Sequence, residues 1–183
     1  MIGNLMKRYA EVTARLQGAF SHMAKKGKTL AMRTLDAHKI EYSVYQFPDT
    51  IHNAAEVAAQ IGKPAEQVFK TLVVLRDGEE RAHPLLVIVP GSQEINLRHL
   101  AHELGVKSVH MAGHDQAEKL TGLKVGGISS LALLNRPFDI YLDTSAQNFT
   151  EILMSAGERG TNLQLKVSDF LALTQAQLIS TTP

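Results

Sequence analysis

Residues 70–75 read KTLVVL, and residues 85–89 read LLVIV. Both runs are rich in β-branched and large apolar side chains, which favour strands buried in a sheet. Asp77 and Gly78 lie between the runs and form a dipeptide that is typical of tight turns. These residues therefore predict two buried strands that follow one another along the chain.

Helices and strands are expected in an irregular order on both sides of these two runs. The best-marked helix starts after Asn53, which with Glu56 resembles a capping box, and stops at Gly62. Further helices are expected at residues 29–38, at 64–69 as a short turn, at 96–104, from a box-like start at Asp115 and Glu118 to 121–122, and after a cap at Ser168; further strands are expected at residues 42–47, 108–111, 138–142, 151–154 and 163–167. Because no regular βαβ rhythm appears, the expected fold class is α+β with a mixed, curved sheet.

The length of 183 residues suits one domain with a substantial core. Residues 1–28 are expected to form a helical extension and a basic linker, because apolar residues recur at helical spacing before a group of lysines. The folded domain is then expected at residues 29–183. No apolar run of roughly eighteen residues and no signal-peptide pattern is present, so we expect a cytoplasmic protein without a membrane segment.

Several kinds of chemistry are disfavoured by the sequence. The chain has no cysteine, which excludes a thiolate nucleophile and thiolate metal sites. The histidines at 99 and 102 stand in HLAHE, which is not the zinc-binding order HExxH, and neither GSQEI nor GISSL is the GxSxG turn of serine hydrolases. Phosphate-binding glycine motifs are also missing. The formal net charge of +1 leaves only a local basic patch for any contact with nucleic acid.

Three features remain as candidates for a site, and each has two readings. Lys70 could place its ammonium at a pocket mouth, or extend to water from a strand edge while its stem packs on apolar neighbours. Gly126 and Gly127 could present amide donors to a ligand, or form a tight turn. The SAGERG loop at residues 155–160 could direct Arg159 at a phosphate, or be an ordinary hairpin loop.

The order of these features resembles a known family. VFKTLVV at 68–74, TGLKVGGIS at 121–129 and SAGERG at 155–160 together resemble the YbaK/ProX family of aminoacyl-tRNA deacylases, which is related to the editing insertion of bacterial prolyl-tRNA synthetases. The resemblance covers residues 29–178. It implies a single α+β domain with a barrel-like sheet and a small pocket for the aminoacyl-adenosine end of tRNA, without metal or cofactor.

The resemblance also assigns the site. The characteristic lysine of the family falls on Lys70, as the catalytic residue. The residues expected to bind substrate are Phe47, Thr71, Gly126, Gly127, Ile128, Ser129, Ser155, Gly157, Arg159, Gly160 and Asn162. The GGIS form resembles the branch that clears Cys-tRNA(Pro), so the implied partners are tRNA(Pro) and, as a further candidate, prolyl-tRNA synthetase.

The chain departs from the pattern of this branch at several positions. Ser130 and Ala132 replace a proline and a glycine, and Phe47 keeps an aromatic wall where a tyrosine is common. In the last loop Ala156 replaces a glycine, Glu158 reverses the charge of a lysine, and Asn162 occupies an acidic position. The reversed charge at Glu158 weakens the expected phosphate contact.

The expected mechanism stabilises the charge that develops on the ester carbonyl oxygen. Lys70 and the amides of Gly126 and Gly127 are expected to position the ester. For a cysteinyl ester, the resemblance implies that the thiol of the substrate attacks its own carbonyl to give a thiolactone, and the protein supplies geometry. The alternatives are hydrolysis of Ala-tRNA(Pro) or another small aminoacyl-tRNA by water, and a non-catalytic module that binds tRNA or a synthetase.

Overall fold

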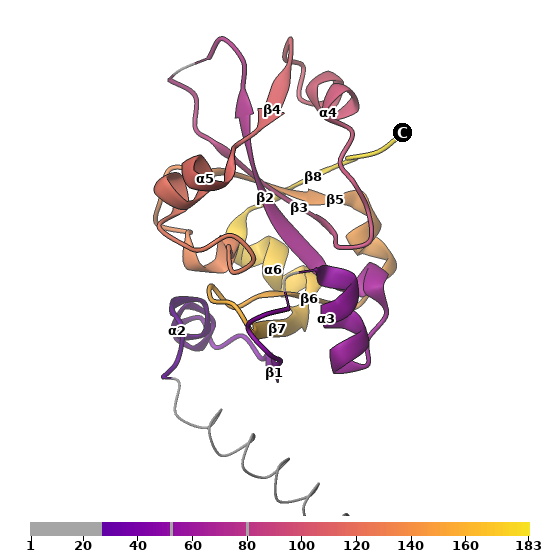
Figure 1. Ribbon diagram of the computed structural model, residues 1–183. Helices are drawn as coiled ribbons and strands as arrows, with labels where there is room; N and C mark the ends of the chain where they lie inside the picture. The colour runs from indigo at the N-terminus through magenta and orange to yellow at the C-terminus, as the bar shows by residue number, and fades with distance from the viewer. Residues whose placement is uncertain (1–26, 52, 80) are drawn as a thin grey trace, which may run out of the picture.

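Figure 1 shows the computed structural model, which describes residues 27–51, 53–79 and 81–183. The extension expected at residues 1–28 falls almost wholly outside the described residues, so the division at residue 28 stays a prediction. The described residues form one α+β domain with two sheets and five α-helices, which confirms the expected fold class. None of the described helices is long and apolar enough to cross a membrane.

The larger sheet has five strands in the order β4-β2-β3-β5-β8. They are β2 (Phe69–Arg76), β3 (Leu85–Pro90), β4 (Val109–Met111), β5 (Asp139–Asp143) and β8 (Gln177–Ile179). β2 pairs antiparallel with β3 and β4, whereas β3 with β5 and β5 with β8 are parallel pairs, so the sheet is mixed as expected. All of β3 is buried, because its alternate side chains enter core clusters on both faces of the sheet.

The smaller sheet has three antiparallel strands in the order β1-β7-β6. They are β1 (Ser43–Gln46), β6 (Glu151–Ser155) and β7 (Thr161–Lys166). A single parallel bridge between Val68 and Leu153 links this sheet to the larger one. The expectation of one barrel-like sheet is therefore corrected. The segments of β2 and β6 meet at this bridge and then diverge, and within the described residues this bridge is the only strand pairing between the two sheets.

Most of the expected helices are confirmed, with their end signals. The helices are α2 (Leu30–Ala37), α3 (Ala54–Ile61), α4 (Leu97–Glu103), α5 (His114–Thr121) and α6 (Val167–Thr174), with short 3-10 turns η1 (Ala65–Gln67), η2 (Ser130–Ala132) and η3 (Thr144–Asn148). The Asn53 side chain accepts a hydrogen bond from the N–H of Ala55 at 2.8 Å, and Gly62 ends α3 in the left-handed region.

Two expected helix starts are wrong. α5 begins after Gly113, so Asp115 lies in its first turn, and Glu118 instead binds Lys124 and the N–H of Val125. α6 begins at Val167, and Ser168 lies inside it. The cause is the pairing of β7 with β6, which continues to the last residue of β7 and leaves no loop in which Ser168 could cap.

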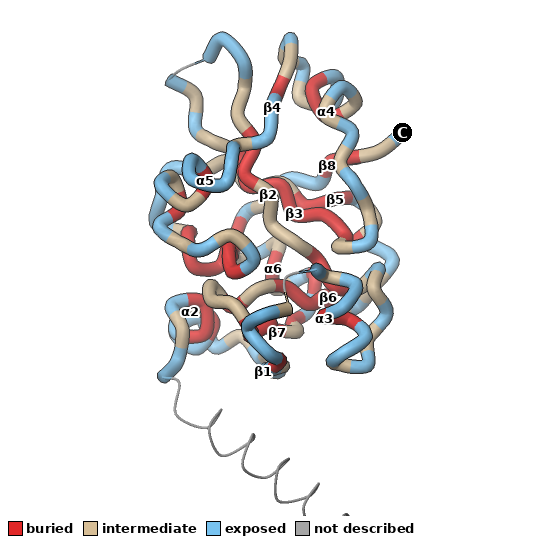
Figure 2. Tube along the Cα trace, viewed as in Figure 1, coloured by how far each residue is buried: buried red, intermediate tan, exposed pale blue. Residues whose placement is uncertain are grey.

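The main core lies between the two sheets, and α2 and α6 complete it. Phe170 of α6, Leu35 of α2 and Leu163 of β7 are fully buried in one cluster with Ile88 of β3. α4 covers the other face of the larger sheet with Leu100. Figure 2 shows this pattern as buried central strands surrounded by helices with exposed outer faces.

Candidate functional site

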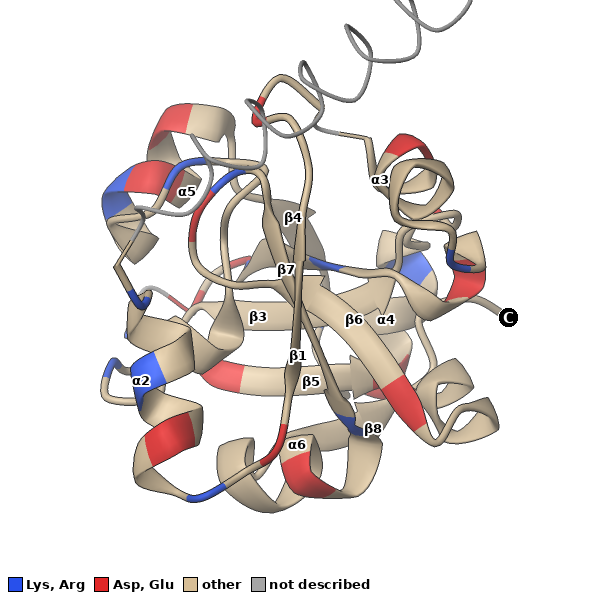
Figure 3. Ribbon diagram, turned by 90° about the horizontal axis from the view of Figure 1, so that it is seen from below, with Lys and Arg blue, Asp and Glu red and all other residues tan. Residues whose placement is uncertain are grey.

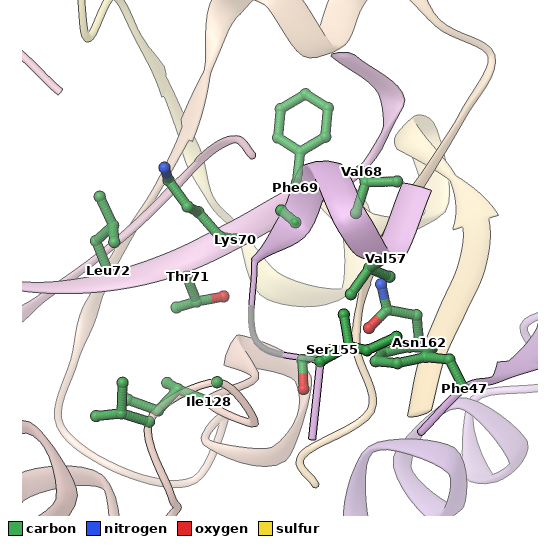
Figure 4. A pocket seen from close by; sticks show the side chains of 14 residues that line it. Phe47, Val57, Val68, Phe69, Lys70, Thr71, Leu72, Ile128, Ser155 and Asn162 are labelled. Carbon is green, nitrogen blue, oxygen red and sulfur yellow. The ribbon is translucent and has the colours of Figure 1, made fainter. Parts of the chain in front are cut away.

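A small pocket lies where β2 and β6 diverge beyond the bridge between Val68 and Leu153 (Figure 4). Its volume is about 190 Å³, which is below the roughly 300–1,000 Å³ of sites for drug-sized ligands. The lining residues are Phe47, Ile51, Ala54, Val57, Val68, Phe69, Lys70, Thr71, Leu72, Val125, Gly126, Ile128, Ser155 and Asn162. A pocket of this size suits a small group such as an amino acid and not a whole nucleotide.

Lys70 is half-buried in the pocket lining, and the loop that follows β3 holds its ammonium. Its Nζ donates to the carbonyl of Gln93 at 2.8 Å and to that of Gly91 at 3.3 Å. An ammonium has three N–H donors, so one donor remains for a ligand. Burial lowers the pKa of Lys70, and the nearby carboxylate of Glu94 partly opposes this effect. Lys70 is thus a pocket residue with a fixed head, and not a lysine that extends freely to water.

Thr71 brings an unpaired stretch of main chain to the pocket. The N–H of Gly91 donates to the carbonyl of Val68. Because main-chain groups alternate along an antiparallel ladder, the N–H and C=O groups of the even-numbered residues of β2 point toward β3. The N–H and C=O of Thr71 therefore point to the other edge, where β4 pairs only with residues 74–76. This open edge adds main-chain polar groups beside Lys70.

One wall of the pocket is apolar. Phe47, Val57 and Val68 line it and belong to a buried cluster. Close approach of α3 makes this wall, and Gly91 permits it: a Cβ added to Gly91 would lie 2.0 Å from the Cβ of Ala54. Gly91 therefore has two roles, because its carbonyl also accepts from Lys70.

Ser155 and Asn162 form a polar wall on the smaller sheet. They are opposite each other in the register of β6 and β7, and both side chains line the pocket. In the neighbouring pair, the N–H of Ala156 donates to the carbonyl of Thr161. Ser155 and Asn162 therefore form a pair without main-chain hydrogen bonds between them, and side chains lie closest in such pairs. The Ser155 hydroxyl accepts a hydrogen bond from the N–H of Gly157 at 3.2 Å.

The two glycine loops contact each other directly beside the pocket. A Cβ on Gly127 would lie 2.8 Å from the backbone nitrogen of Arg159, so only glycine fits there. Arg159 donates through Nε to the carbonyl of Val125 at 2.8 Å, and Glu158 accepts from the hydroxyl of Thr161 at 3.0 Å. Arg159 thus holds the neighbouring loop, and the Glu158 carboxylate is engaged within its own loop.

The structure brings together only part of the expected site. Lining the pocket are Phe47, Lys70, Thr71, Gly126, Ile128, Ser155 and Asn162. Outside the lining are Gly127, Ser129, Gly157, Arg159 and Gly160. Their surroundings show why: the hydroxyl of Ser129 is fully buried without a partner among the described residues, and a Cβ on Gly160 would lie 2.8 Å from the carbonyl oxygen of Phe47. These residues position the pocket walls.

One expected donor is corrected. The N–H of Gly127 bonds to the carbonyl of Lys124 at 2.8 Å and closes a turn, so it is not directed at a ligand. Gly126 is exposed, has a positive φ of 88° and lines the pocket. Of the two glycines, only Gly126 can present its amide there; its role as a donor stays a prediction.

Sequence reasoning missed the residues that fix Lys70. Gly91 and Gln93 stand in GSQEI, a segment that lacks the GxSxG pattern and is not among the expected site residues. The available signal was a glycine directly after the apolar strand, which marks a close approach of backbone. Val57 and Val68, also missed, are ordinary apolar positions whose place in the pocket follows from tertiary contacts.

Among the residues that the structure describes, the pocket lining holds no histidine, aspartate or glutamate. Groups of three or more potential metal ligands are also absent from the part of the chain that the structure describes. A general base or a metal-bound water therefore has no evident protein group within this lining. The chemistry that the lining can provide is hydrogen bonding to a carbonyl oxygen, from Lys70 and the Gly126 amide.

The outer surface carries charges of both signs. Figure 3 shows basic and acidic residues together on α2 and on α5. Arg33 and Asp36 of α2 and Glu118 and Lys119 of α5 are examples. Such mixing agrees with the net charge of +1, and on these two helices it forms no uniformly basic surface.

Comparisons with known proteins agree with this geometry. The model of the aminoacyl-tRNA editing domain family matches residues 49–173. A protein of Enterococcus faecalis named as a candidate Cys-tRNA(Pro)/Cys-tRNA(Cys) deacylase, EbsC, is 36% identical over 165 residues, which cover 87% of this chain and 98% of that protein.

Two further similarities concern prolyl-tRNA synthetase. A proline–tRNA ligase of Staphylococcus saprophyticus is 29% identical over 113 residues, covering 62% of this chain and 19% of the ligase. The crystal structure of a candidate trans-editing enzyme for prolyl-tRNA synthetase superposes with a TM-score of 0.71 at 23% identity, covering 84% of this chain and 95% of that one. The latter similarity supports the fold.

Proposed function

The chain belongs to the aminoacyl-tRNA editing domain family, and from this premise we propose that it is a deacylase whose main substrate is Cys-tRNA(Pro). The family match and the similarity to EbsC support deacylation of a mischarged tRNA. The choice of cysteine rests on the pocket itself, as argued next.

The observation that carries the proposal is a pocket whose described lining residues include one lysine and no acidic or histidine side chain. Hydrolysis by water needs a base to remove a proton, and the described part of the lining supplies none. A cysteinyl ester avoids this requirement because it carries its own nucleophile. Because the thiol and the carbonyl belong to one molecule, no encounter between two molecules is needed. In well-oriented systems, the effective concentration of such a nucleophile reaches about 10⁵–10⁸ M.

The proposed reaction has two steps. The substrate sulfur forms a bond to the carbonyl carbon, the bond between that carbon and the ester oxygen breaks, and the terminal hydroxyl of tRNA leaves with the proton that the thiol gives up. Water then opens the cyclic thiolactone to free cysteine. The remaining N–H of Lys70 and the amide of Gly126 would hydrogen-bond the carbonyl oxygen as it gains negative charge.

The shape of the pocket supports a small side chain. Its volume of about 190 Å³ is below the roughly 300–1,000 Å³ that is typical of sites for drug-sized ligands. Phe47, Val57 and Val68 provide an apolar wall against which a CH₂SH group can pack. Larger side chains would need this close-packed wall to move.

We also propose prolyl-tRNA synthetase as a partner that helps select tRNA(Pro). The net charge of only +1 supports this idea, because it provides no strong overall attraction to RNA. Addition of the synthetase should then increase the rate on tRNA(Pro) more than on other tRNAs that carry cysteine.

The test compares esters on one tRNA. Cysteine, serine and alanine are each attached to tRNA(Pro), and release is measured with the uncatalysed rate subtracted. Cysteine should be released at least about 100-fold faster than serine, which has the same shape but a much weaker nucleophile. Equal rates for cysteine and alanine would instead establish water as the nucleophile and contradict the thiol mechanism.

A matched control separates enzyme from binding module. Lys70→Ala should lose release of cysteine while its circular dichroism spectrum stays that of the wild type. If the wild type releases none of the three amino acids but binds tRNA or the synthetase, the chain is a non-catalytic module.

A further inference from the structure

Asn162 is the most buried polar side chain of the pocket. It lies on β7 opposite Ser155 of β6 and Tyr45 of β1, and only 7% of its surface is exposed. Its side-chain amide makes no hydrogen bond with any residue that the structure describes. Figure 4 shows it between Val57 and Ser155, within the pocket.

The amide atoms of Asn162 are not among the completely buried side-chain atoms without a partner, so they are open to the pocket, where a ligand or a bound water can complete their hydrogen bonds. The other polar side chains of the lining differ from it. Ser155 already accepts from Gly157, Thr71 is half-exposed and can be solvated, and Lys70 has donors only. Asn162 thus provides the buried acceptor that the pocket leaves unused.

An aminoacyl ester contains a matching donor. Its carbonyl oxygen accepts hydrogen bonds and suits Lys70, whereas its α-amino group donates them and needs an acceptor. The Asn162 oxygen is such an acceptor, and it carries no charge that would compete for the ammonium of Lys70. On the basis of the proposed function, we infer that Asn162 binds the α-amino group of the aminoacyl ester and so orients it in the pocket.

This contact decides how the substrate sits. With the carbonyl at Lys70 and the α-amino group at Asn162, the two polar ends of the pocket are occupied, and the side chain is left facing the apolar wall. For cysteine, this arrangement holds the carbon between the amine and the carbonyl at two points, which limits unproductive rotation and keeps the thiol near the carbonyl carbon. Asn162 is thus a positioning residue for the reaction and does not discriminate between amino acids by itself.

The experiment removes either partner of the contact in turn. Cysteinyl-tRNA(Pro) is compared with 3-mercaptopropionyl-tRNA(Pro), which keeps the thiol and the ester but lacks the α-amino group. Each rate is divided by the uncatalysed rate of the same ester. The wild type should prefer the cysteinyl ester by about tenfold, and Asn162→Ala should reduce this preference to less than about threefold.

The control is Thr71→Val, which removes a lining hydroxyl that has no partner among the described residues and keeps the side-chain volume nearly constant. It should keep the tenfold preference. If Asn162→Ala loses its circular dichroism spectrum, Asn162→Val provides the same comparison with a residue that favours strands. An unchanged preference in the Asn162 variant, or an equal loss in Thr71→Val, overturns the inference.

A binding measurement keeps this inference separate from the proposed function. 3′-Cysteinylamino-3′-deoxyadenosine has an amide that is not hydrolysed, and its counterpart without the α-amino group serves as the reference. Calorimetry should show about tenfold tighter binding of the first compound to the wild type and a smaller difference for Asn162→Ala. Failure of the wild type to hydrolyse any ester would count against the proposed function, whereas the ratio of the two affinities decides the role of Asn162.

Discussion

At the scale of single residues, the environment of Lys70 determines what the pocket can do. Two of its three donors are held by the carbonyls of Gly91 and Gln93, so its third donor has a defined direction. A lysine fixed in this way needs little reorganisation when charge develops on a nearby oxygen. Under the proposed function, Lys70 is therefore a placed hydrogen-bond donor, and its protonation state should control the reaction rate.

The pH dependence of deacylation should report this state. Burial lowers the pKa of Lys70, so its ammonium loses the proton at a lower pH than the ordinary 10.5 of an exposed lysine. The catalysed rate should therefore fall as the pH rises through this lowered pKa. The measurement is kcat/KM for Cys-tRNA(Pro) against pH, with the spontaneous hydrolysis of the ester subtracted.

Lys70→Met is the reference for this measurement. Methionine keeps the apolar stem but has no donor, and loss of one such donor typically reduces rates by about 100-fold to 1,000-fold. Its residual rate should show no fall in the alkaline range. A wild-type profile parallel to that of Lys70→Met would show that Lys70 does not control the rate.

At the scale of elements, the loop after α5 and the loop between β6 and β7 act as one unit. Gly127 is buried under the backbone of residues 158–159, and Arg159 ties the loop after β6 to Val125. Gly126 and Ile128, which flank Gly127, line the pocket. The position of the pocket wall therefore depends on a contact outside the pocket.

Gly127→Ala should disturb this unit. The added Cβ would lie 2.8 Å from backbone atoms of both Glu158 and Arg159, and backbone cannot yield as a side chain can. Such overpacking typically costs about 1–3 kcal/mol of unfolding free energy. We expect a loss in this range by urea denaturation, together with a larger loss of kcat than the stability change alone explains.

Gly113→Ala is the matched control for Gly127→Ala. Gly113 has a φ of −61° and no atom within 4 Å of an added Cβ, so only its weak preference as a helix cap is affected. Its activity should equal that of the wild type. If Gly127→Ala behaves in the same way, the close packing of the two loops does not shape the site.

At the scale of the whole molecule, Asp143 attaches the C-terminal segment to the larger sheet. Its carboxylate is 4% exposed and accepts hydrogen bonds from the N–H and hydroxyl of Thr181 and from those of Ser145. Pairing of β8 with β5 completes the edge of the sheet beside this cluster. A buried carboxylate with four donors is well satisfied, and each donor depends on it.

Asp143→Ala should therefore destabilise the fold without changing the chemistry. It leaves the buried donors of Thr181 and the partly buried donors of Ser145 without Asp143, for a loss of about 3 kcal/mol or more by urea denaturation. Thr181→Val removes one of these bonds and should cost about 1–2 kcal/mol. Because neither residue lines the pocket, kcat should stay unchanged at temperatures where the variants are folded. The reverse order of stabilities would contradict the central place of Asp143.

The sequence alone determined most of the elements and their ends. Asn53 and Gly62 delimit α3 because capping and the left-handed turn are local properties of the chain. The apolar runs became β2 and β3 because their side chains suit a buried sheet. Local signals failed where tertiary pairing decides: the ladder of β7 sets the start of α6, and the three-residue β8, which has no pattern of its own, forms only because β5 offers an edge.

Only the tertiary structure decided which residues share the pocket. The motifs placed Lys70, Gly126, Ser155 and Asn162 among the site residues, but not Gly127 in the contact between loops or Gly91 beneath Lys70. The pocket exists because β2 and β6 meet at one bridge and diverge, and strand pairing between distant segments depends on the packing of the whole core. The unpaired state of Asn162 has the same origin: it follows from which side chains the completed fold places within reach of the amide, and neighbours in the sequence do not reveal this.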